Sequence, residues 1–108
     1  LHNYYTPICT LIDKKYIDKA LELAKLNPKS LLKQCGYYSE NVVDFLIERE
    51  NVDLALKFGK INTKTISANI IKGLIEKEDI KDEQILSFAK LNPVELDKGG
   101  DNPMVHAN

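Results

Sequence analysis

The stretch Ala24-Lys25-Leu26-Asn27-Pro28 returns late in the chain as Ala89-Lys90-Leu91-Asn92-Pro93, and a relaxed copy, Gly59-Lys60-Ile61-Asn62-Thr63, lies between them. The copies start 35 and 30 residues apart. A second element repeats as well, because Asn41 to Glu48 and Asn69 to Glu76 both carry a β-branched pair followed by Leu-Ile-Glu. Two interleaved repeats with such a period indicate a solenoid of stacked structural units.

Apolar residues recur with a helical period along the whole chain, and no stretch shows the alternation of a half-buried strand. The fold class is therefore predicted as all-α, and Thr6-Pro7 is a suitable cap and first turn for an early helix. Further helices are expected over residues 17–24, from Asn27-Pro28 to Gly36, from a cap at Ser39 to Arg49, over 52–59, from Asn62 or Thr63 to Ile75, over 85–89, and from Asn92-Pro93 to Gly99-Gly100, with a loop at 76–83.

Helices of this length cannot each bury an apolar face alone, so they are expected to stack as antiparallel neighbours. The 108 residues fit one domain or about three to four stacked helical hairpins. Hydrophobic residues make up 44% and charged residues 29% of the chain, a globular balance that argues against disorder.

The charge is nearly balanced overall but is unevenly distributed. The net charge is −1, with +3 over residues 1–38 and −3 over residues 39–58. Neither segment forms the basic stripe that phosphate neutralisation requires, so nucleic-acid binding is not expected.

Cys9 and Cys35 are the two cysteines, and their neighbours are apolar or small. We expect two buried free thiols, which favours a reducing, cytoplasmic compartment. No apolar run approaches the ~18 residues of a membrane span, and the N-terminus lacks the pattern of a secretory signal. We therefore predict a protein that is neither inserted in a membrane nor secreted by that route.

No set of residues predicts catalysis. His2 and His106 lie far apart and pair with no cysteine at metal-ligand spacing, and Gly99-Gly100 is an isolated pair rather than a phosphate loop. The acids between Glu76 and Glu83 alternate with lysines, as on a solvated helix face. We expect no catalytic, cofactor-binding or metal-binding residue, and hence no enzyme.

The C-terminal stretch resembles the opening of an ankyrin repeat, whose pattern runs Asp-x-x-Gly-Asn-Thr-Pro-Leu-His-x-Ala. The positions that match are Gly100, Pro103, Met104 and Ala107, whereas the family's His falls on Val105 and His106 lies one place late. Residues 1–98 are accordingly read as degenerate ankyrin-like repeats and 99–108 as the start of a further one, so we expect the chain to be a fragment of a longer protein.

Other segments resemble the same family. Asn41 to Glu48 and Asn69 to Glu76 are similar to the second helix of an ankyrin repeat, and Thr6-Pro7-Ile8 is similar to the start of a first helix, with Ile17 to Ala24 as its outer partner. The break at 49–51 is too short for the projecting hairpin of a regular repeat. Tetratricopeptide units have a similar period, but their Trp is absent from this chain. The ankyrin resemblance implies a non-catalytic scaffold for protein–protein interaction.

The adjacent pair Tyr37-Tyr38 is the candidate contact for another protein, since tyrosine is common in binding hot spots, although tyrosines at a helix turn also close repeat interfaces. A monomer is expected, with self-association through Met104-Val105 as an alternative. A second reading is a helical cap or linker of a larger enzyme or of a pathogen effector, which would be delivered into a host cytoplasm.

Overall fold

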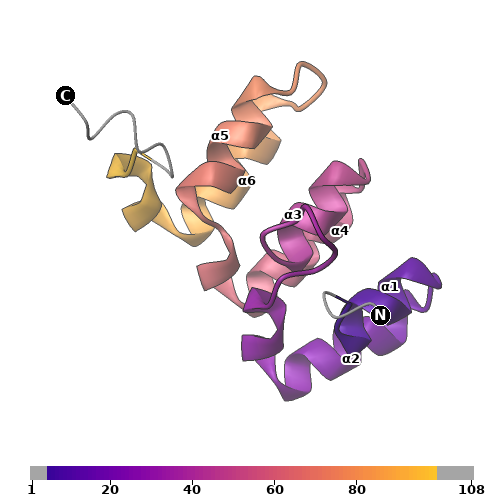
Figure 1. Ribbon diagram of the computed structural model, residues 1–108. Coiled ribbons are helices and arrows are strands. Elements are labelled where there is room, and N and C mark those ends of the chain that lie inside the picture. Colours follow the sequence, from indigo (N-terminus) through magenta and orange to yellow (C-terminus); the bar gives the residue numbers. More distant parts are fainter. Residues whose placement is uncertain (1–4, 100–108) are drawn as a thin grey trace. The chain divides into compact units, whose positions relative to one another are not determined.

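The computed structural model describes residues 5–99, and this part of the chain consists of six α-helices and three short 3-10 helices without a strand (Figure 1). The predicted all-α class is confirmed over these residues. The chain divides into two compact units, one that reaches to Thr65 and one that begins at Ile66. The predicted repeat start at 99–108 lies, apart from Gly99, outside the described residues.

The first hairpin consists of α1 (Pro7–Asp13) and α2 (Ile17–Leu26), which pack against each other. Thr6 caps α1, because its Oγ1 accepts a hydrogen bond of 3.3 Å from the Cys9 N–H, and Pro7 occupies the first turn as expected. The reversal between the helices is tight, with Lys15 at φ 73°. Helix α2 contributes the fully buried small residues Ala20 and Ala24 to the core.

The second hairpin repeats this plan with α3 (Val42–Glu48) and α4 (Val52–Ile61). In both hairpins a helix of 7 residues is followed by one of 10 residues. Glu50, at φ 62°, takes the place of Lys15 in the turn. Asn41 to Glu48 therefore contributes the first helix of a hairpin, so its assignment as a second helix was wrong. The break at 49–51 reverses the chain within a hairpin and does not separate two repeats.

The cap of α3 is Asn41 rather than the expected Ser39. The Asn41 Oδ1 accepts from the N–H groups of Val43 and Asp44 at 2.9 and 3.2 Å, and its Nδ2 donates to the Thr65 carbonyl at 2.9 Å. An amide side chain serves better here because it can accept at the helix end and donate across the unit at once. The core of this unit is formed by fully buried side chains from all its helices, including Cys9, Leu31, Val42, Leu46 and Phe58.

The unit that begins at Ile66 contains α5 (Ala68–Glu76) and α6 (Asp82–Leu91), which pack as a third hairpin. Helix α5 does not begin at Asn62 or Thr63, because a 3-10 turn and an extended segment precede it, and Ser67 caps it through an Oγ that accepts from Ile70 N–H at 3.2 Å. Asn69 to Glu76 thus also lies in a first helix. The predicted loop at 76–83 is confirmed over 77–81, with Asp82 and Glu83 already in the first turn of α6.

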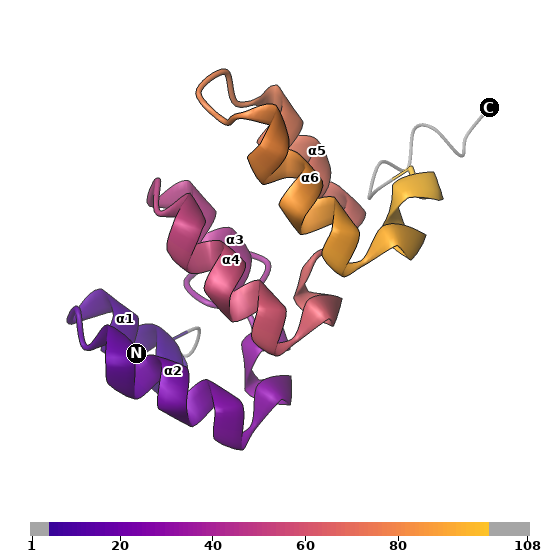
Figure 2. The same cartoon turned by 180° about the vertical axis from the view of Figure 1, so that it is seen from behind.

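The three copies of the Asn-containing repeat occupy the same local structure. Asn27, Asn62 and Asn92 end α2, α4 and α6 with nearly equal backbone angles, φ/ψ of −146/81°, −142/100° and −149/67°. A 3-10 helix follows each of them: η1 (Pro28–Leu32), η2 (Thr63–Thr65) and η3 (Pro93–Asp97), visible after each second helix in Figure 2. The sequence repeat is therefore a structural repeat. The helix expected from Asn27-Pro28 to Gly36 is correspondingly shorter and ends at Leu32.

Candidate protein-interaction surface

Tyr37 and Tyr38 lie in the loop between η1 and α3 and point largely into solvent. Their exposed fractions are 65% and 91%, and the two rings meet edge to face with centroids 4.7 Å apart. Large aromatic side chains so exposed bury little on folding and leave their area available to a partner. This exposure favours a contact with a partner, and the alternative in which both tyrosines close a repeat interface stays a prediction.

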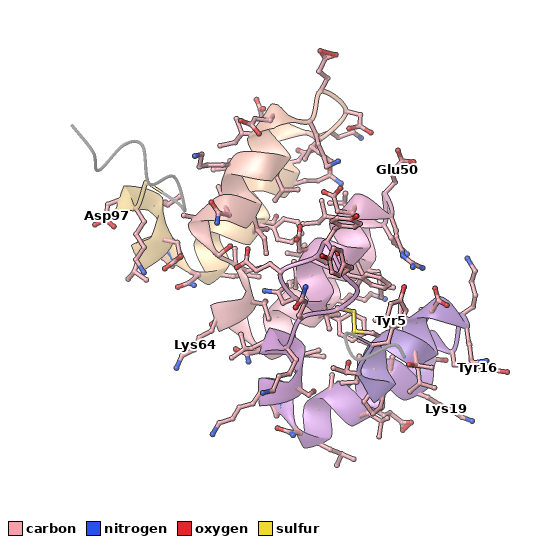
Figure 3. The ribbon with its side chains drawn as sticks, in the orientation of Figure 1. Tyr5, Tyr16, Lys19, Glu50, Lys64 and Asp97 are labelled. Atoms are coloured by element: carbon pink, nitrogen blue, oxygen red, sulfur yellow. A yellow bond between two sulfur atoms is a disulfide. The ribbon has the colours of Figure 1, made fainter. Side chains whose placement is uncertain are left out.

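The loop that carries the tyrosines is held at several points. Cys35 is joined to Cys9 of α1 by a disulfide with a Cα–Cα distance of 5.8 Å, drawn in yellow in Figure 3. Gly36 follows at φ 82°, and a Cβ there would lie 3.4 Å from the Phe45 ring. The Gln34 Nε2 donates to the Tyr37 carbonyl at 2.8 Å. The backbone beneath the two rings is thus fixed before any partner arrives.

The expectation of two free thiols was wrong, although both cysteines are fully buried as predicted. The reason is geometric, because η1 turns the chain so that Cys35 comes within disulfide range of Cys9 on the first helix. A separation of 26 residues gave no sign of this contact. The inference of a reducing, cytoplasmic compartment rested on free thiols and loses that support.

Arg49 connects the two hairpins of this unit close to the loop. Its Nη1 lies 2.9 Å from the Asp13 carboxylate, and its guanidinium stacks 4.0 Å from the centroid of the Phe45 ring. Tyr5, labelled in Figure 3, meets Phe45 edge to face at 6.0 Å. These contacts tie α1 to α3, and the Arg49 charge is already paired with Asp13.

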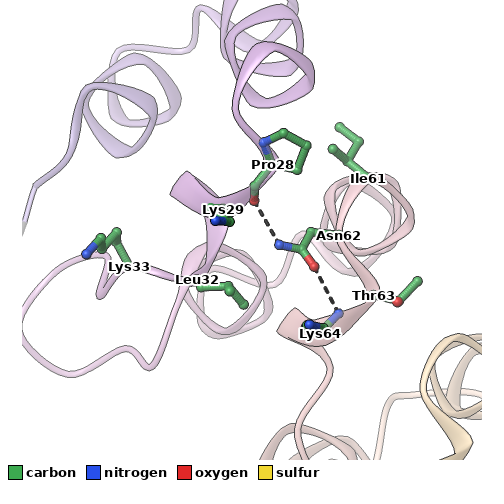
Figure 4. A pocket seen from close by; sticks show the side chains of 8 residues that line it. All are labelled: Pro28, Lys29, Leu32, Lys33, Ile61, Asn62, Thr63 and Lys64. Atoms are coloured by element: carbon green, nitrogen blue, oxygen red, sulfur yellow. Dashed lines mark hydrogen bonds between the residues drawn. The ribbon is translucent and has the colours of Figure 1, made fainter.

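A second surface feature of the same unit is an open groove between η1 and η2, with a volume of about 700 Å³ (Figure 4). Asn62 lies at its centre, where its Nδ2 donates to the Pro28 carbonyl at 2.9 Å and its Oδ1 accepts from the Lys64 N–H at 3.1 Å. The repeated Asn therefore ties one connector to the other. The groove is lined by Pro28, Lys29, Leu32, Lys33, Ile61, Asn62, Thr63 and Lys64.

The groove carries positive charge without a carboxylate among its lining residues. Lys29, Lys33 and Lys64 are exposed, and none of them forms an ion pair with a residue in the described range 5–99. Lys25 and Lys60 lie in the last turns of α2 and α4, where they complement the helix dipoles. The three lining lysines follow the helix ends and add charge beyond that compensation.

The groove was not predicted from the sequence, although the repeat places two lysines at equivalent positions. Lys29 and Lys64 occupy the same place in the repeat, two residues after Asn27 and Asn62. In the third copy the corresponding residue is Val94. The first two connectors alone are therefore basic at this position.

In the unit that begins at Ile66, Glu95 has a structural role. Its Oε1 accepts from the Ala68 N–H at 3.0 Å, and its Oε2 pairs with the Lys98 ammonium. The hydrogen bond from Lys98, followed by the one from Ala68, holds the pKa of the Glu95 carboxyl below its usual value. This carboxylate joins η3 to the start of α5.

The remaining chemistry-bearing residues do not converge. Between residues 5 and 99 no three metal-ligating side chains gather into a potential ion site. Glu76, Asp79 and Glu83 are exposed around the turn between α5 and α6. His2 and His106 lie outside the described residues. In the same range no helix is long and apolar enough to cross a membrane.

Over residues 5–99 the chain thus belongs to the all-helical proteins. Each of its helical hairpins is followed by a connector of the same kind, a 3-10 helix. Comparison with protein-family models, with curated proteins and with solved structures finds no match.

Proposed function

We propose that this chain is a non-catalytic scaffold of ankyrin-like helical hairpins that binds another protein through the loop at 33–41. The resemblance to ankyrin repeats is supported by the alternation of shorter and longer helices in the first unit and by the recurring connector after each hairpin. Scaffolds of this kind present side chains from successive units to a partner without turnover.

The observation that carries the proposal is the exposed Tyr37-Tyr38 pair on a fixed loop. Binding costs free energy when flexible loops must be ordered, and a loop tied by a disulfide and by the Gln34 hydrogen bond avoids much of that cost. Each tyrosine offers stiff apolar area and a polar hydroxyl, the combination that interface hot spots favour.

The test compares wild type with the double variant Tyr37→Ala, Tyr38→Ala. Partners are first captured from lysate, identified and purified, and the binary affinity is then measured by calorimetry. Truncation of one hot spot costs about 2 kcal/mol, so the double variant should bind at least about thirtyfold more weakly. Circular dichroism must show the same helical content in both proteins.

Tyr16→Ala is the matched control. Tyr16 is exposed as well, to 55%, but it lies at the turn between α1 and α2. It should retain the wild-type affinity. Equal affinity of the Tyr37/Tyr38 variant and wild type would overturn the proposal that this loop is the binding surface.

A further inference from the structure

The groove between η1 and η2 is a second surface with a chemistry of its own. We propose that it binds an extended acidic segment of a protein partner, in which carboxylates flank an aliphatic side chain. The inference rests on the proposed function in that the ligand is a protein, but it involves neither Tyr37 nor Tyr38, and Lys33 is the residue that the groove shares with the loop at 33–41.

The charge of the groove indicates that the ligand is acidic. Lys29, Lys33 and Lys64 line the groove, no carboxylate lies among the lining residues, and none of the three ammonium groups is neutralised by an ion pair within residues 5–99. A groove of one sign attracts a ligand of the other and speeds its association. Three lysines along one groove fit a ligand with several separated carboxylates better than a single anion.

The shape and apolar surface of the groove indicate that the ligand is extended and carries an aliphatic side chain. Pro28, Leu32 and Ile61 contribute apolar groups, and Leu32 remains 40% exposed. The groove is open, whereas sites for small molecules enclose most of the ligand. An extended peptide can lie along such a surface with an aliphatic side chain against Leu32 and its carboxylates near the lysines.

The same features disfavour a nucleic acid. Single strands are bound by a charged groove with aromatic side chains on which the bases stack. No aromatic residue lines this groove, and its apolar groups are aliphatic. A peptide uses both properties of the groove, whereas a nucleic acid uses the charge alone.

Hydrogen bonds within and between η1 and η2 hold the groove in place and indicate a preformed site. Asn62 bridges the two connectors through the Pro28 carbonyl and the Lys64 N–H. The Ser30 and Thr65 hydroxyls each donate to the carbonyl of the preceding Asn at 2.7 Å, which fixes η1 and η2 in the same way. Lys29 and Lys64 thus start from equivalent, ordered backbone positions.

The experiment measures binding of a fluorescein-labelled peptide, Asp-Glu-Leu-Asp-Glu-Leu-Glu, to the full chain by fluorescence anisotropy. We expect saturable binding that weakens as salt is raised. The variant Lys29→Gln, Lys33→Gln, Lys64→Gln should bind about tenfold more weakly, since it lacks three exposed charge contacts. The control variant Lys14→Gln, Lys57→Gln, Lys90→Gln loses the same charge elsewhere and should bind like wild type.

Two further peptides test separately the carboxylates and the aliphatic side chains of the ligand. A peptide with amides in place of all carboxylates should not bind measurably, and one with Ser in place of both Leu residues should bind several-fold more weakly. Leu32→Ser should weaken the parent peptide but not the Ser peptide. Equal binding of the parent peptide by the two triple variants would overturn the proposal.

Other ligands give outcomes that also overturn it. A thymidine oligonucleotide of equal charge that binds more tightly, with dependence on the same lysines, would assign the groove to nucleic acid. Full competition by inorganic phosphate would show an anion site without peptide recognition. Sedimentation of wild type as a dimer and of the groove triple variant as a monomer would make a second copy the occupant.

The result is separable from that of the proposed function. The Tyr37→Ala, Tyr38→Ala variant should bind the acidic peptide like wild type. If the groove variant loses nothing while the tyrosine variant loses its partner, the groove assignment fails and the scaffold stands. The reverse pattern removes the tyrosine surface and keeps the groove.

Discussion

Replacement of Asn41 by Ala should destabilise the protein more than any exposed polar substitution. Asn41 is 3% exposed and makes three hydrogen bonds, two from backbone N–H groups at the start of α3 and one to the Thr65 carbonyl. Alanine removes the helix cap and leaves a buried carbonyl without its donor. One side chain thus fixes both the start of α3 and the end of η2.

The expected magnitude follows from these two losses. An N-cap contributes about 1 kcal/mol, and a buried backbone group left unsatisfied costs about 1–3 kcal/mol. We therefore expect the free energy of unfolding to fall by about 2–4 kcal/mol, a large share of the ~5–15 kcal/mol of a typical domain.

The assay is urea unfolding in non-reducing buffer, followed by far-ultraviolet circular dichroism. Asn41→Ser separates the contributions, because its hydroxyl can cap α3 but is too short to replace the amide that reaches Thr65. Asn51→Ala is the control, since Asn51 is exposed and caps α4 without a side-chain hydrogen bond. A loss of unfolding free energy for Asn41→Ala no greater than that for Asn51→Ala would show that the three Asn41 hydrogen bonds do not stabilise the fold.

Three further outcomes are expected. Cys9→Ala, Cys35→Ala should lower the free energy of unfolding by about 3.5 kcal/mol, from the entropy of the 26-residue loop that the disulfide closes; thiol titration of denatured wild type must find no free thiol, and two thiols would contradict the disulfide. Gly36→Ala should cost about 1–2 kcal/mol in the same unfolding assay, because φ is 82° there, and an unchanged midpoint would count against that backbone. The pKa of Glu95 is lowered from 4.5 by Lys98 and then by the Ala68 N–H, so Glu95 adds stability above pH 4.5 that is lost as the pH falls through its folded pKa; Glu95→Gln should flatten the acid side of the stability profile, and superimposable profiles would contradict this.

Local patterns predicted much of the fold. The helical period of the apolar residues gave the all-α class over residues 5–99, and the repeated Asn marked the end of every second helix. These features depend on residues close in sequence. The placement of Asn41 to Glu48 in the wrong helix of a hairpin shows the limit, because its amphipathic pattern is the same in either helix.

The loop at 33–41 and the groove could not be predicted in the same way, because they depend on contacts between residues far apart in the sequence. The Cys9–Cys35 disulfide forms because η1 is a short 3-10 turn and not the longer helix expected there. The cap at Asn41 gains its advantage over Ser39 from Thr65, 24 residues away. The groove arises where two connectors are brought together, so the equivalent positions of Lys29 and Lys64 in the repeat gave only an indirect sign of it.

Hydrogen–deuterium exchange on the isolated complex reports whether the loop at 33–41 contacts the protein partner. We predict slower exchange on binding in peptides that contain Tyr37 and Tyr38, while peptides from the turn between α1 and α2 exchange as in the free chain. Unchanged exchange over 33–41, with protection confined to residues 66–99, would show that the partner does not bind this loop.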